Sequence, residues 1–586
     1  MSVEGDVQAT FCATLVDEWI RAGLTDAVVC PGSRSTPMAL ALADRDELRV
    51  HVRLDERGAG FFAVGLGLAT GRPALVLTTS GTAAAELHAS VVEAHHARVP
   101  MVVCTADRPP ELQAVGAPQT IEQAGLFGPA VRWFAGPGVA DGATRATWRP
   151  LGARSVAESV DGPLGPGPVH LNLAFREPLV GQPGPLPAGD PRGGPVHRRH
   201  GGRTGPGPDV GGWPGRRGVI VAGAGCGPPG GVLGLAEALG WPVLADPRSG
   251  CRVPHPNVVA AADAMLRSDA VRGWLRPEVI VVLGAPWASK IVAGFLADAA
   301  GAGAETVAVD PWWRWADPDR TVTDLVTADP GPWVEQARSA VPPVAPWGGE
   351  WLRPWQVAER AAQDAIDREL TGSRLTEPGV ARRLFRLLPV GTRVVVASSM
   401  PVRDLEWYAP PVTDPPPVLA NRGANGIDGV ASTAQGVAAA GRGPVVGVLG
   451  DLAFLHDVSS LVGPAAPAAP VGSPAASCTL LVVDNRGGGI FNFLPQAGRV
   501  ERGRFEQLFG TPAAPDVADV ARGFGLPVHD VGTAGELDGA LSATVGTPGL
   551  SVVRARVPDR VENVAVHDQL HRAVADAVDE AVGPRG

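Results

Sequence analysis

The stretch PVVGVLGDLAFLHDVSSL (444–461) predicts a buried β-strand that ends at Gly450 and Asp451 and leads directly into a helix. The stretch LLVVDNRGGG (480–489) predicts a second strand, which ends at Asn485 and a glycine-rich turn. Strands that alternate with helices are typical of a parallel sheet covered by helices. Ligands bind beyond the carboxyl ends of such strands, so both turns are candidate parts of a functional site.

The same alternation runs through most of the chain. In the first part, predicted strands over 27–30, 74–78 and 101–105 end in the polar turns PGSRST (31–36), TSGT (79–82) and ADRPP (106–110). The pattern resumes at Val219 and again with strands over 393–397, 445–449 and 480–483. No repeat of about 20–50 residues is evident. The sequence therefore predicts an α/β protein of three successive doubly wound domains.

Changes in composition mark the expected domain boundaries. A chain of 586 residues is too long for one core. Gly, Pro and Arg dominate residues 181–217, which we interpret as a linker too poor in apolar residues to contribute to a core. The α/β pattern fades again in the Pro- and Trp-rich stretch 341–355. We therefore expect domains over 1–180, 218–345 and 356–586.

Composition excludes several classes of function. A net charge of −10 gives no electrostatic support for a nucleic-acid partner. No apolar run is long enough for a membrane span, and we expect no export signal in the acidic first residues. The six cysteines are widely spaced and form no CxxC pair, which argues against disulfides or a thiolate zinc site and favours the cytoplasm.

The two turns of the third domain carry metal-binding chemistry. The Asp451 carboxylate, the Asn485 amide oxygen and the Gly487 carbonyl are hard oxygen ligands that could supply half of an octahedral Mg²⁺ shell. The helix after Asp451 would point free N–H groups at a diphosphate. Gly-Asp and Asn-Arg-Gly-Gly are also common in ordinary turns, so the residues alone leave both interpretations open.

This pair of turns resembles the GDG…N signature of thiamine diphosphate enzymes. Leu452 replaces the usual third glycine, and the 34 positions from Asp451 to Asn485 exceed the usual spacing. A low-complexity insertion over 463–477 accounts for the excess, because it can loop out without moving either strand end. Thiamine enzymes also need a carboxylate on the cofactor's pyrimidine ring. Glu56, before an apolar helix that could raise its pKa, is the candidate, although an exposed helix N-terminal Glu is the simpler interpretation.

Over nearly the whole chain the sequence resembles one family, the thiamine-dependent 2-succinyl-5-enolpyruvyl-6-hydroxy-3-cyclohexene-1-carboxylate synthases of menaquinone biosynthesis. In this family GDL replaces GDG, which agrees with Leu452. The matching stretches follow the family order from residue 31 to residue 495: PGSRSTP, DERGAGFFA, LTTSGTAAAELH, ADRPPEL, GAPQTIEQ, SSMPVRD, NRGANGIDG, GDLAFLHD and DNRGGGIFNFLP.

The resemblance implies a transferase that joins 2-oxoglutarate to isochorismate with loss of CO₂. It implies thiamine diphosphate and Mg²⁺ or Mn²⁺ as cofactors. Both substrates are dianions, for which guanidinium groups are natural clamps. By resemblance, isochorismate meets Ser33, Arg34, Arg108 and Gln119. The substrate carboxylates near the reactive carbon of the cofactor are held by Ser399, Arg403 and Arg422.

The resemblance assigns further residues to the cofactor. They are Glu56, Ile427 as the wedge that bends thiamine, Gly450, Asp451, Leu452, Asn485, Gly487 and Gly489, with Ile490, Phe491 and Leu494 as an apolar wall. Asp451, Asn485 and Gly487 are the expected metal ligands. Lys290, the one lysine of the chain, lies near a substrate-facing lysine of the family, but a surface lysine explains it too.

Two further motifs give little support for a functional site. The stretch VAGAGCGPPGG (221–231) has Pro228 where a dinucleotide loop needs its last glycine, so we expect a central domain without a cofactor. His95 and His96 are adjacent and cannot share a helix face, which argues against a metal site there.

Other interpretations remain at this point. One is a different thiamine enzyme, an acetolactate synthase or a 2-oxo acid decarboxylase, which would not need four carboxylate clamps. The other is a non-catalytic regulatory protein of the same fold, which would have lost Glu56 or the metal pair. The superfamily resemblance also implies a homodimer as the minimum active unit, paired into a homotetramer, because Glu56 of one subunit meets the cofactor of another.

Overall fold

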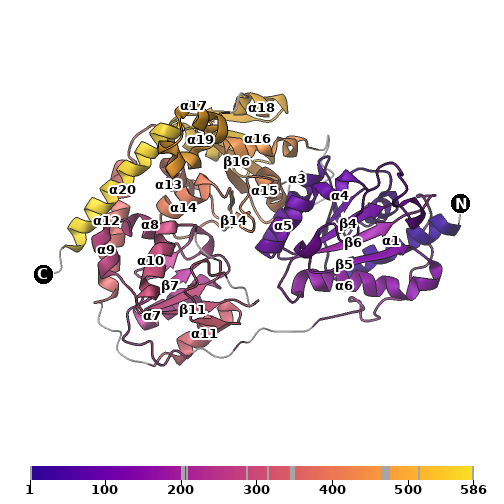
Figure 1. The fold of residues 1–586 in the computed structure, drawn as a ribbon, viewed down its shortest axis with the longest axis horizontal. Coiled ribbons are helices and arrows are strands. Elements are labelled where there is room, and N and C mark those ends of the chain that lie inside the picture. The colour runs from indigo at the N-terminus through magenta and orange to yellow at the C-terminus, as the bar shows by residue number, and fades with distance from the viewer. Residues whose placement is uncertain are drawn as a thin grey trace.

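The computed structural model describes residues 3–199, 205, 209–285, 288–312, 316–342, 350–463, 476–512 and 515–583. These residues form three sheets of six strands each, and all strand pairs within the sheets are parallel. Figure 1 shows three lobes, with helices packed around each sheet. The predicted fold class is confirmed.

The first sheet has the order β2-β1-β3-β4-β6-β5. Its strands are β1 (Asp26–Val29), β2 (Arg49–Val52), β3 (Ala74–Thr78), β4 (Met101–Asp107), β5 (Phe134–Val139) and β6 (Pro168–Ala174). Its helices are α1 (Val3–Arg21), α2 (Thr36–Ala43), α3 (Glu56–Thr70), α4 (Thr82–Glu86), α5 (His88–Ala97) and α6 (Trp148–Asp161). The strand order reverses beside β1 and β3, so a ligand is expected where these two strands end.

The central sheet has the order β12-β11-β10-β7-β8-β9. Its strands are β7 (Gly218–Ala222), β8 (Val243–Ala245), β9 (Val258–Val259), β10 (Val279–Leu283), β11 (Glu305–Val309) and β12 (Asp324–Val326). Its helices are α7 (Pro229–Leu239), α8 (Ala262–Met265), α9 (Asp269–Trp274), α10 (Lys290–Gly301) and α11 (Pro330–Ala340). The turn after β7 is closed against the turn after β10, because Ala285 N donates to Ala224 O at 2.8 Å.

The third sheet, β14-β13-β15-β16-β18-β17, repeats the strand order of the first. Its strands are β13 (Arg393–Val396), β14 (Val418–Ala420), β15 (Val445–Gly450), β16 (Ser477–Asp484), β17 (Val528–Val531) and β18 (Gly549–Arg556). Its helices are α12 (Leu352–Glu369), α13 (Glu377–Leu387), α14 (Met400–Tyr408), α15 (Val430–Ala439), α16 (Asp451–His456), α17 (Arg502–Phe505), α18 (Val517–Gly523), α19 (Ala534–Thr544) and α20 (Arg560–Val582). Residues 464–475, most of the predicted insertion, lie outside the described residues.

The expectation that 181–217 contributes to no core was wrong. Val210 and Trp213 are 1% and 3% exposed and belong to the apolar core of the central sheet. Closer to the first sheet, Gly184 N donates to Thr10 Oγ1 at 2.9 Å, which ties the segment to α1. The segment needs few apolar residues of its own to be buried, because it packs against the central sheet and the first helix.

Helices of the third part complete the core of the central sheet. Trp351 and Trp355, at the start of α12, are buried with strands β7 and β10 in one apolar cluster. The same cluster includes Leu570, Val574 and Val578 of α20. Figure 1 shows α20 running along the outside of both lobes. Helices of the third part therefore belong to the core of the central sheet, while the strands of the third sheet lie in apolar clusters of their own.

The first and third lobes meet through helices. Helices α3 and α15 pack together more extensively than any other pair of helices in the described chain. Figure 1 shows α3 and α5 on the side of the first lobe that faces α15.

No helix among the described residues combines the length and apolar character that crossing a membrane requires.

Candidate active site

The turns after β15 and β16 meet as the sequence predicted. Asp451 is the first residue of α16 and is only 4% exposed. Its carboxylate accepts hydrogen bonds from Leu452 N at 2.9 Å and from Gly487 N at 2.6 Å. The two candidate metal-binding turns are thus joined by a direct hydrogen bond.

Asn485, in the second of these turns, has an unsatisfied side-chain oxygen. Its side chain is buried, and Nδ2 donates to Glu377 Oε1 at 2.6 Å. The other amide atom, Oδ1, is buried and has no hydrogen-bond partner among the described residues. A buried amide oxygen without a donor is costly unless a ligand completes it, and a divalent cation is such a ligand.

Glycines make room for this arrangement. Gly487 has φ +130°, and a Cβ there would lie 2.2 Å from Gly510 O. A Cβ on Gly489 would lie 2.4 Å from Asn485 Nδ2. Only glycine therefore fits at 487, where both the conformation and the space exclude a side chain.

The electrostatics of the turn favour a cation. Burial raises the pKa of Asp451 to about 7, and the neighbouring Asp484 carboxylate adds to the rise. A bound divalent cation would remove this penalty, because it stabilises the ionised carboxylate. Among the described residues, no cluster of three or more His, Cys, Asp and Glu side chains could hold a metal. The Asp451 site differs in kind, since its other two ligands would be amide and backbone oxygens.

The helix after Asp451 is shorter than predicted. Helix α16 ends at His456, and a 3₁₀ turn over Val458–Leu461 replaces its expected continuation. The Asp457 carboxylate between them accepts hydrogen bonds from Ser432 N and Oγ, at 2.7 and 3.0 Å. A helix of six residues contributes little dipole, so the backbone N–H groups and the cation would matter more for a diphosphate.

A second group of predicted residues lies at the carboxyl edge of the first sheet. Ser33 is exposed and Arg34 is buried after β1, and Arg108 directly follows β4. Burial lowers the pKa of Arg34, and the positive charge of Arg108 lowers it further, so the two guanidinium groups are neighbours. Arg34 Nη1 donates to Phe175 O at 3.0 Å, while its buried Nε has no partner among the described residues.

Gln119 joins this group from the loop after β4. Its Nε2 donates to the backbone carbonyl of Ser80 at 3.0 Å, and the backbone carbonyl of Gln119 accepts a hydrogen bond from Ser80 Oγ at 2.8 Å. Ser80 follows β3, which lies next to both β1 and β4 in the sheet. The structure therefore brings the four predicted isochorismate residues to the ends of three adjacent strands.

Glu56 is the first residue of α3 and is partly buried. Burial raises its pKa above the ordinary value, and the carboxylates of Asp55 and Glu86 add to the rise. Its neighbour Arg57 donates to His456 O at 2.9 Å, at the far end of α16 from Asp451. The Arg57 contact therefore links the start of α3 to the end of α16 that lies away from Asp451.

Ser399, Arg403 and Arg422 lie at the edge of the third sheet. Ser399 precedes α14, and Arg403 Nη1 donates to the carbonyls of Ser398 and Ser399 at 3.1 and 2.7 Å. Burial lowers the pKa of Arg422, and the charges of Arg248 and Arg403 lower it further. Three guanidinium groups therefore gather here, and the Asp246 and Glu406 carboxylates lie close to them.

Lys290 is exposed at the first turn of α10, and among the described residues its ammonium has no ion pair. Ser289, just before it, donates its backbone N–H to Glu406 Oε1 at 3.1 Å and caps the helix. Glu406 belongs to α14, one turn after Arg403. The structure thus places Lys290 beside the helix that carries Arg403.

The predicted apolar residues fall into two sets. Ile427 is 38% exposed in the loop before α15 and could contact a ligand. Ile490 is half-buried against the core of the central sheet, and Phe491 packs on Phe509 with ring centroids 5.7 Å apart. Leu494 is partly buried directly after these residues. Part of the expected wall therefore also serves the core.

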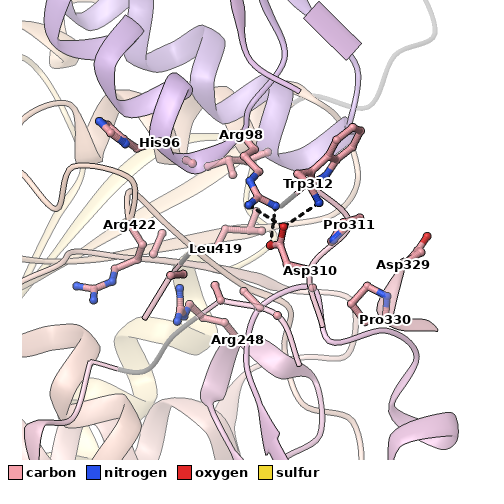
Figure 2. Close-up of a pocket in the computed structure, with 18 of the residues that line it drawn as sticks. His96, Arg98, Arg248, Asp310, Pro311, Trp312, Asp329, Pro330, Leu419 and Arg422 are labelled. Carbon is pink, nitrogen blue, oxygen red and sulfur yellow. Dashed lines mark hydrogen bonds and ion pairs between the residues drawn. The ribbon is translucent and has the colours of Figure 1, made fainter. Parts of the chain in front are cut away.

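A cavity of about 760 Å³ lies next to Arg248 and Arg422. Figure 2 shows the residues that line it. The cavity lies between the end of α5, the turns that follow β7, β10 and β11, and strand β14. Arg98 forms an ion pair with Asp310 at 2.9 Å, and Arg248 and Arg422 also line the cavity. This space therefore adjoins the predicted site residue Arg422.

Sequence reasoning missed three residues that bear on the site. Arg248 follows β8, so the rule that ligands bind at strand ends could have found it. Glu377 contacts Asn485, and Glu93 of α5 accepts hydrogen bonds from Gly423 N and Ala424 N, both at 2.7 Å. No local pattern marks these two glutamates, because their partners are about 100 and 330 positions away.

Comparisons with known proteins identify the family of two parts of the chain. The family model described as thiamine pyrophosphate enzyme, N-terminal TPP binding domain, matches residues 10–126. The model described as middle domain of thiamine pyrophosphate matches residues 206–396.

Three relatives named 2-succinyl-5-enolpyruvyl-6-hydroxy-3-cyclohexene-1-carboxylate synthase align over nearly the full length. The protein of Thermobifida fusca is 43% identical over 96% of this chain and 98% of its own. Those of Chloroflexus aurantiacus and Bacillus velezensis are 39% and 36% identical, over 99% and 97% of this chain and 99% and 98% of theirs. The chain therefore belongs to the thiamine diphosphate-dependent 2-succinyl-5-enolpyruvyl-6-hydroxy-3-cyclohexene-1-carboxylate synthase family.

Proposed function

We propose that this protein decarboxylates 2-oxoglutarate and adds the resulting succinyl unit to isochorismate, as a step of menaquinone biosynthesis. The observation that carries the proposal is the pairing of two different sites in one chain. A buried carboxylate and an unsatisfied amide oxygen meet at the ends of β15 and β16, and arginines gather at the carboxyl edges of the first and third sheets.

In this proposal the third domain holds the cofactor and its cation. Asp451, Asn485 and the Gly487 carbonyl would bind Mg²⁺ or Mn²⁺, since all three offer hard oxygens. Gly450, Leu452 and Gly489 would approach the diphosphate with their backbone, and Ile427, Ile490 and Phe491 would contact the apolar part of thiamine. When bound, thiamine diphosphate supplies a nucleophilic carbon for the keto group and an electron sink for the loss of CO₂.

The arginines would form two groups, each of which binds one of the two dianionic substrates. Arg34 and Arg108, with Ser33 and Gln119, would hold the carboxylates of isochorismate. Burial and the charge of Arg108 both lower the pKa of Arg34, and a bound anion would offset both effects.

The second group would orient 2-oxoglutarate. Arg403 and Arg422, with Ser399 and Lys290, would clamp its carboxylates. Burial of Arg422 strengthens such a contact, because charge-assisted hydrogen bonds gain in a less polar environment.

Glu56 would exchange a proton with the pyrimidine ring of the cofactor. Its raised pKa suits a group that must both take and give a proton near neutral pH. The start of α3 contacts the end of α16 that lies away from Asp451, and we propose that Glu56 serves the cofactor of a second chain. The active unit would then be a homodimer, paired into a homotetramer, and we place it in the cytoplasm.

The decisive experiment supplies the purified protein with thiamine diphosphate, Mg²⁺, 2-oxoglutarate and isochorismate, and detects the product by mass spectrometry. The expected product has the mass of both substrates less CO₂. Release of succinic semialdehyde without an adduct would instead indicate a 2-oxo acid decarboxylase. An adduct formed equally well with pyruvate as acceptor would indicate an enzyme of the acetolactate synthase type.

A further inference from the structure

The side-chain amide of Asn485 has two polar atoms, and only one of them has a hydrogen-bond partner among the described residues. Asn485 is 7% exposed, its Nδ2 donates to Glu377 Oε1 at 2.6 Å, and its Oδ1 has no partner among the described residues. An amide turned by 180° about its last bond would exchange the oxygen and the NH₂ group. The hydrogen bond to Glu377 therefore determines which of the two atoms is left without a partner.

Glu377 is well held in this role. It is the first residue of α13, is 3% exposed, and follows Thr376, whose side chain caps the helix by accepting from Gly379 N at 3.1 Å. Its other polar neighbours are Asp404 and His567, which pair with each other at 2.8 Å. A carboxyl oxygen accepts the Asn485 hydrogen bond in either charge state, so the contact does not depend on ionisation.

We propose that Glu377 is a positioning residue, which orients the Asn485 amide so that Oδ1 faces the divalent cation. The inference rests on the proposed function, because it requires that Asp451, Asn485 and Gly487 bind a cation. Without an acceptor at 377, the amide would turn and present its NH₂ group to the cation, an arrangement that binds no metal. Partners that orient metal ligands are worth about 10–100-fold in metal affinity.

Two substitutions of similar size separate the acceptor from the bulk of the side chain. Glu377→Met fills the same space and accepts no comparable hydrogen bond, whereas Glu377→Gln keeps an oxygen acceptor. Mn²⁺ binding in the presence of thiamine diphosphate, followed by electron paramagnetic resonance, reports affinity without turnover. We expect Glu377→Met to weaken Mn²⁺ binding about 10–100-fold and Glu377→Gln to bind almost as the unsubstituted protein does. Glu377→Leu provides a second side chain without an acceptor if the Met variant is unstable.

Two controls give each outcome a meaning. Thr376→Ala removes the cap of α13 but not the contact with Asn485, so it should leave Mn²⁺ affinity unchanged. Asp451→Ala tests the site itself and should abolish cofactor-dependent Mn²⁺ binding. If the unsubstituted protein and Asp451→Ala bind Mn²⁺ alike, the proposed metal site is wrong. If only Asp451→Ala loses binding while Glu377→Met keeps it, the positioning role is wrong. An equal loss in the Gln, Met and Thr376→Ala variants would also overturn it.

Discussion

The loop that carries Arg422 depends on a glutamate from another domain. Glu93 of α5 is 2% exposed and accepts hydrogen bonds from Gly423 N and Ala424 N, both at 2.7 Å. The backbones are also close, since a Cβ on Gly423 would lie 2.5 Å from Glu93 O. The substitution Glu93→Gln therefore perturbs this loop without touching any residue that we assign to substrate or cofactor.

The expected effect follows from these contacts. Glutamine keeps one oxygen, so one of the two charge-assisted bonds is lost and an NH₂ group faces a backbone N–H. A hydrogen bond to a charged group contributes about 1.5–3 kcal/mol. The loss of one such bond corresponds to about a 10- to 150-fold change in an equilibrium constant. We therefore expect the KM for 2-oxoglutarate to rise by about this factor, while the affinity for thiamine diphosphate changes little. Burial raises the pKa of Glu93, which reflects how few other groups solvate this carboxylate.

Steady-state kinetics and cofactor titration measure the two effects separately. Gly423→Ala should give the same phenotype with Glu93 intact, because its new side chain would press against α5. Glu580→Gln, an identical chemical change at an exposed position of α20, is the matched control and should leave the kinetics unaltered. An unchanged KM in both loop variants, or an equal loss of thiamine diphosphate affinity, would refute the reasoning.

The other predictions concern the assigned chemistry. Glu56→Gln should bind thiamine diphosphate almost normally but lower kcat at least ~10²-fold, and near-normal turnover would contradict its proton-transfer role. Gly487→Ala should lose cation-dependent cofactor retention in calorimetry because its Cβ meets Gly510 O, whereas Gly498→Ala, with open space around it, should retain the cofactor. Arg108→Ala should still release CO₂ from 2-oxoglutarate in a single turnover but raise the KM for isochorismate about 10- to 150-fold, while Arg403→Ala should impair CO₂ release itself. Rapid-quench CO₂ measurement with and without isochorismate decides, and equal impairment of CO₂ release in both variants would refute the division of substrates.

The strand ends were predictable from the sequence because the signal is local. Short apolar runs followed by polar turns identified the sites of Arg34, Arg108, Ser399, Asp451 and Asn485, and the structure places each of them after a strand. The burial of Trp213 was not predictable in this way. Its stretch has the composition of a linker, and only the surface of the central sheet explains why it is covered.

Residues that act across the fold escaped prediction for a different reason. Glu377 and Glu93 each satisfy a group that is distant in sequence, and nothing in their own neighbourhood differs from an ordinary helical glutamate. What distinguishes them is burial together with a polar partner, because a buried carboxyl group needs a hydrogen-bond donor. Such residues become candidates only when the partner is known.

The strand orders explain why the chain carries two incomplete sites. The first and third sheets share one order, so each reverses direction beside equivalent strands, β1 with β3 and β13 with β15. Arg34 follows β1 and Asp451 follows β15. The predicted isochorismate residues and the predicted metal ligands therefore lie beside the point of reversal in two similar sheets. Within one chain α3 packs on α15, and Arg57 at the start of α3 contacts the end of α16 that lies away from Asp451. In the proposed dimer, a second copy would bring its Glu56 to the cofactor that the Asp451 turn holds, so that each active site would take residues from both chains.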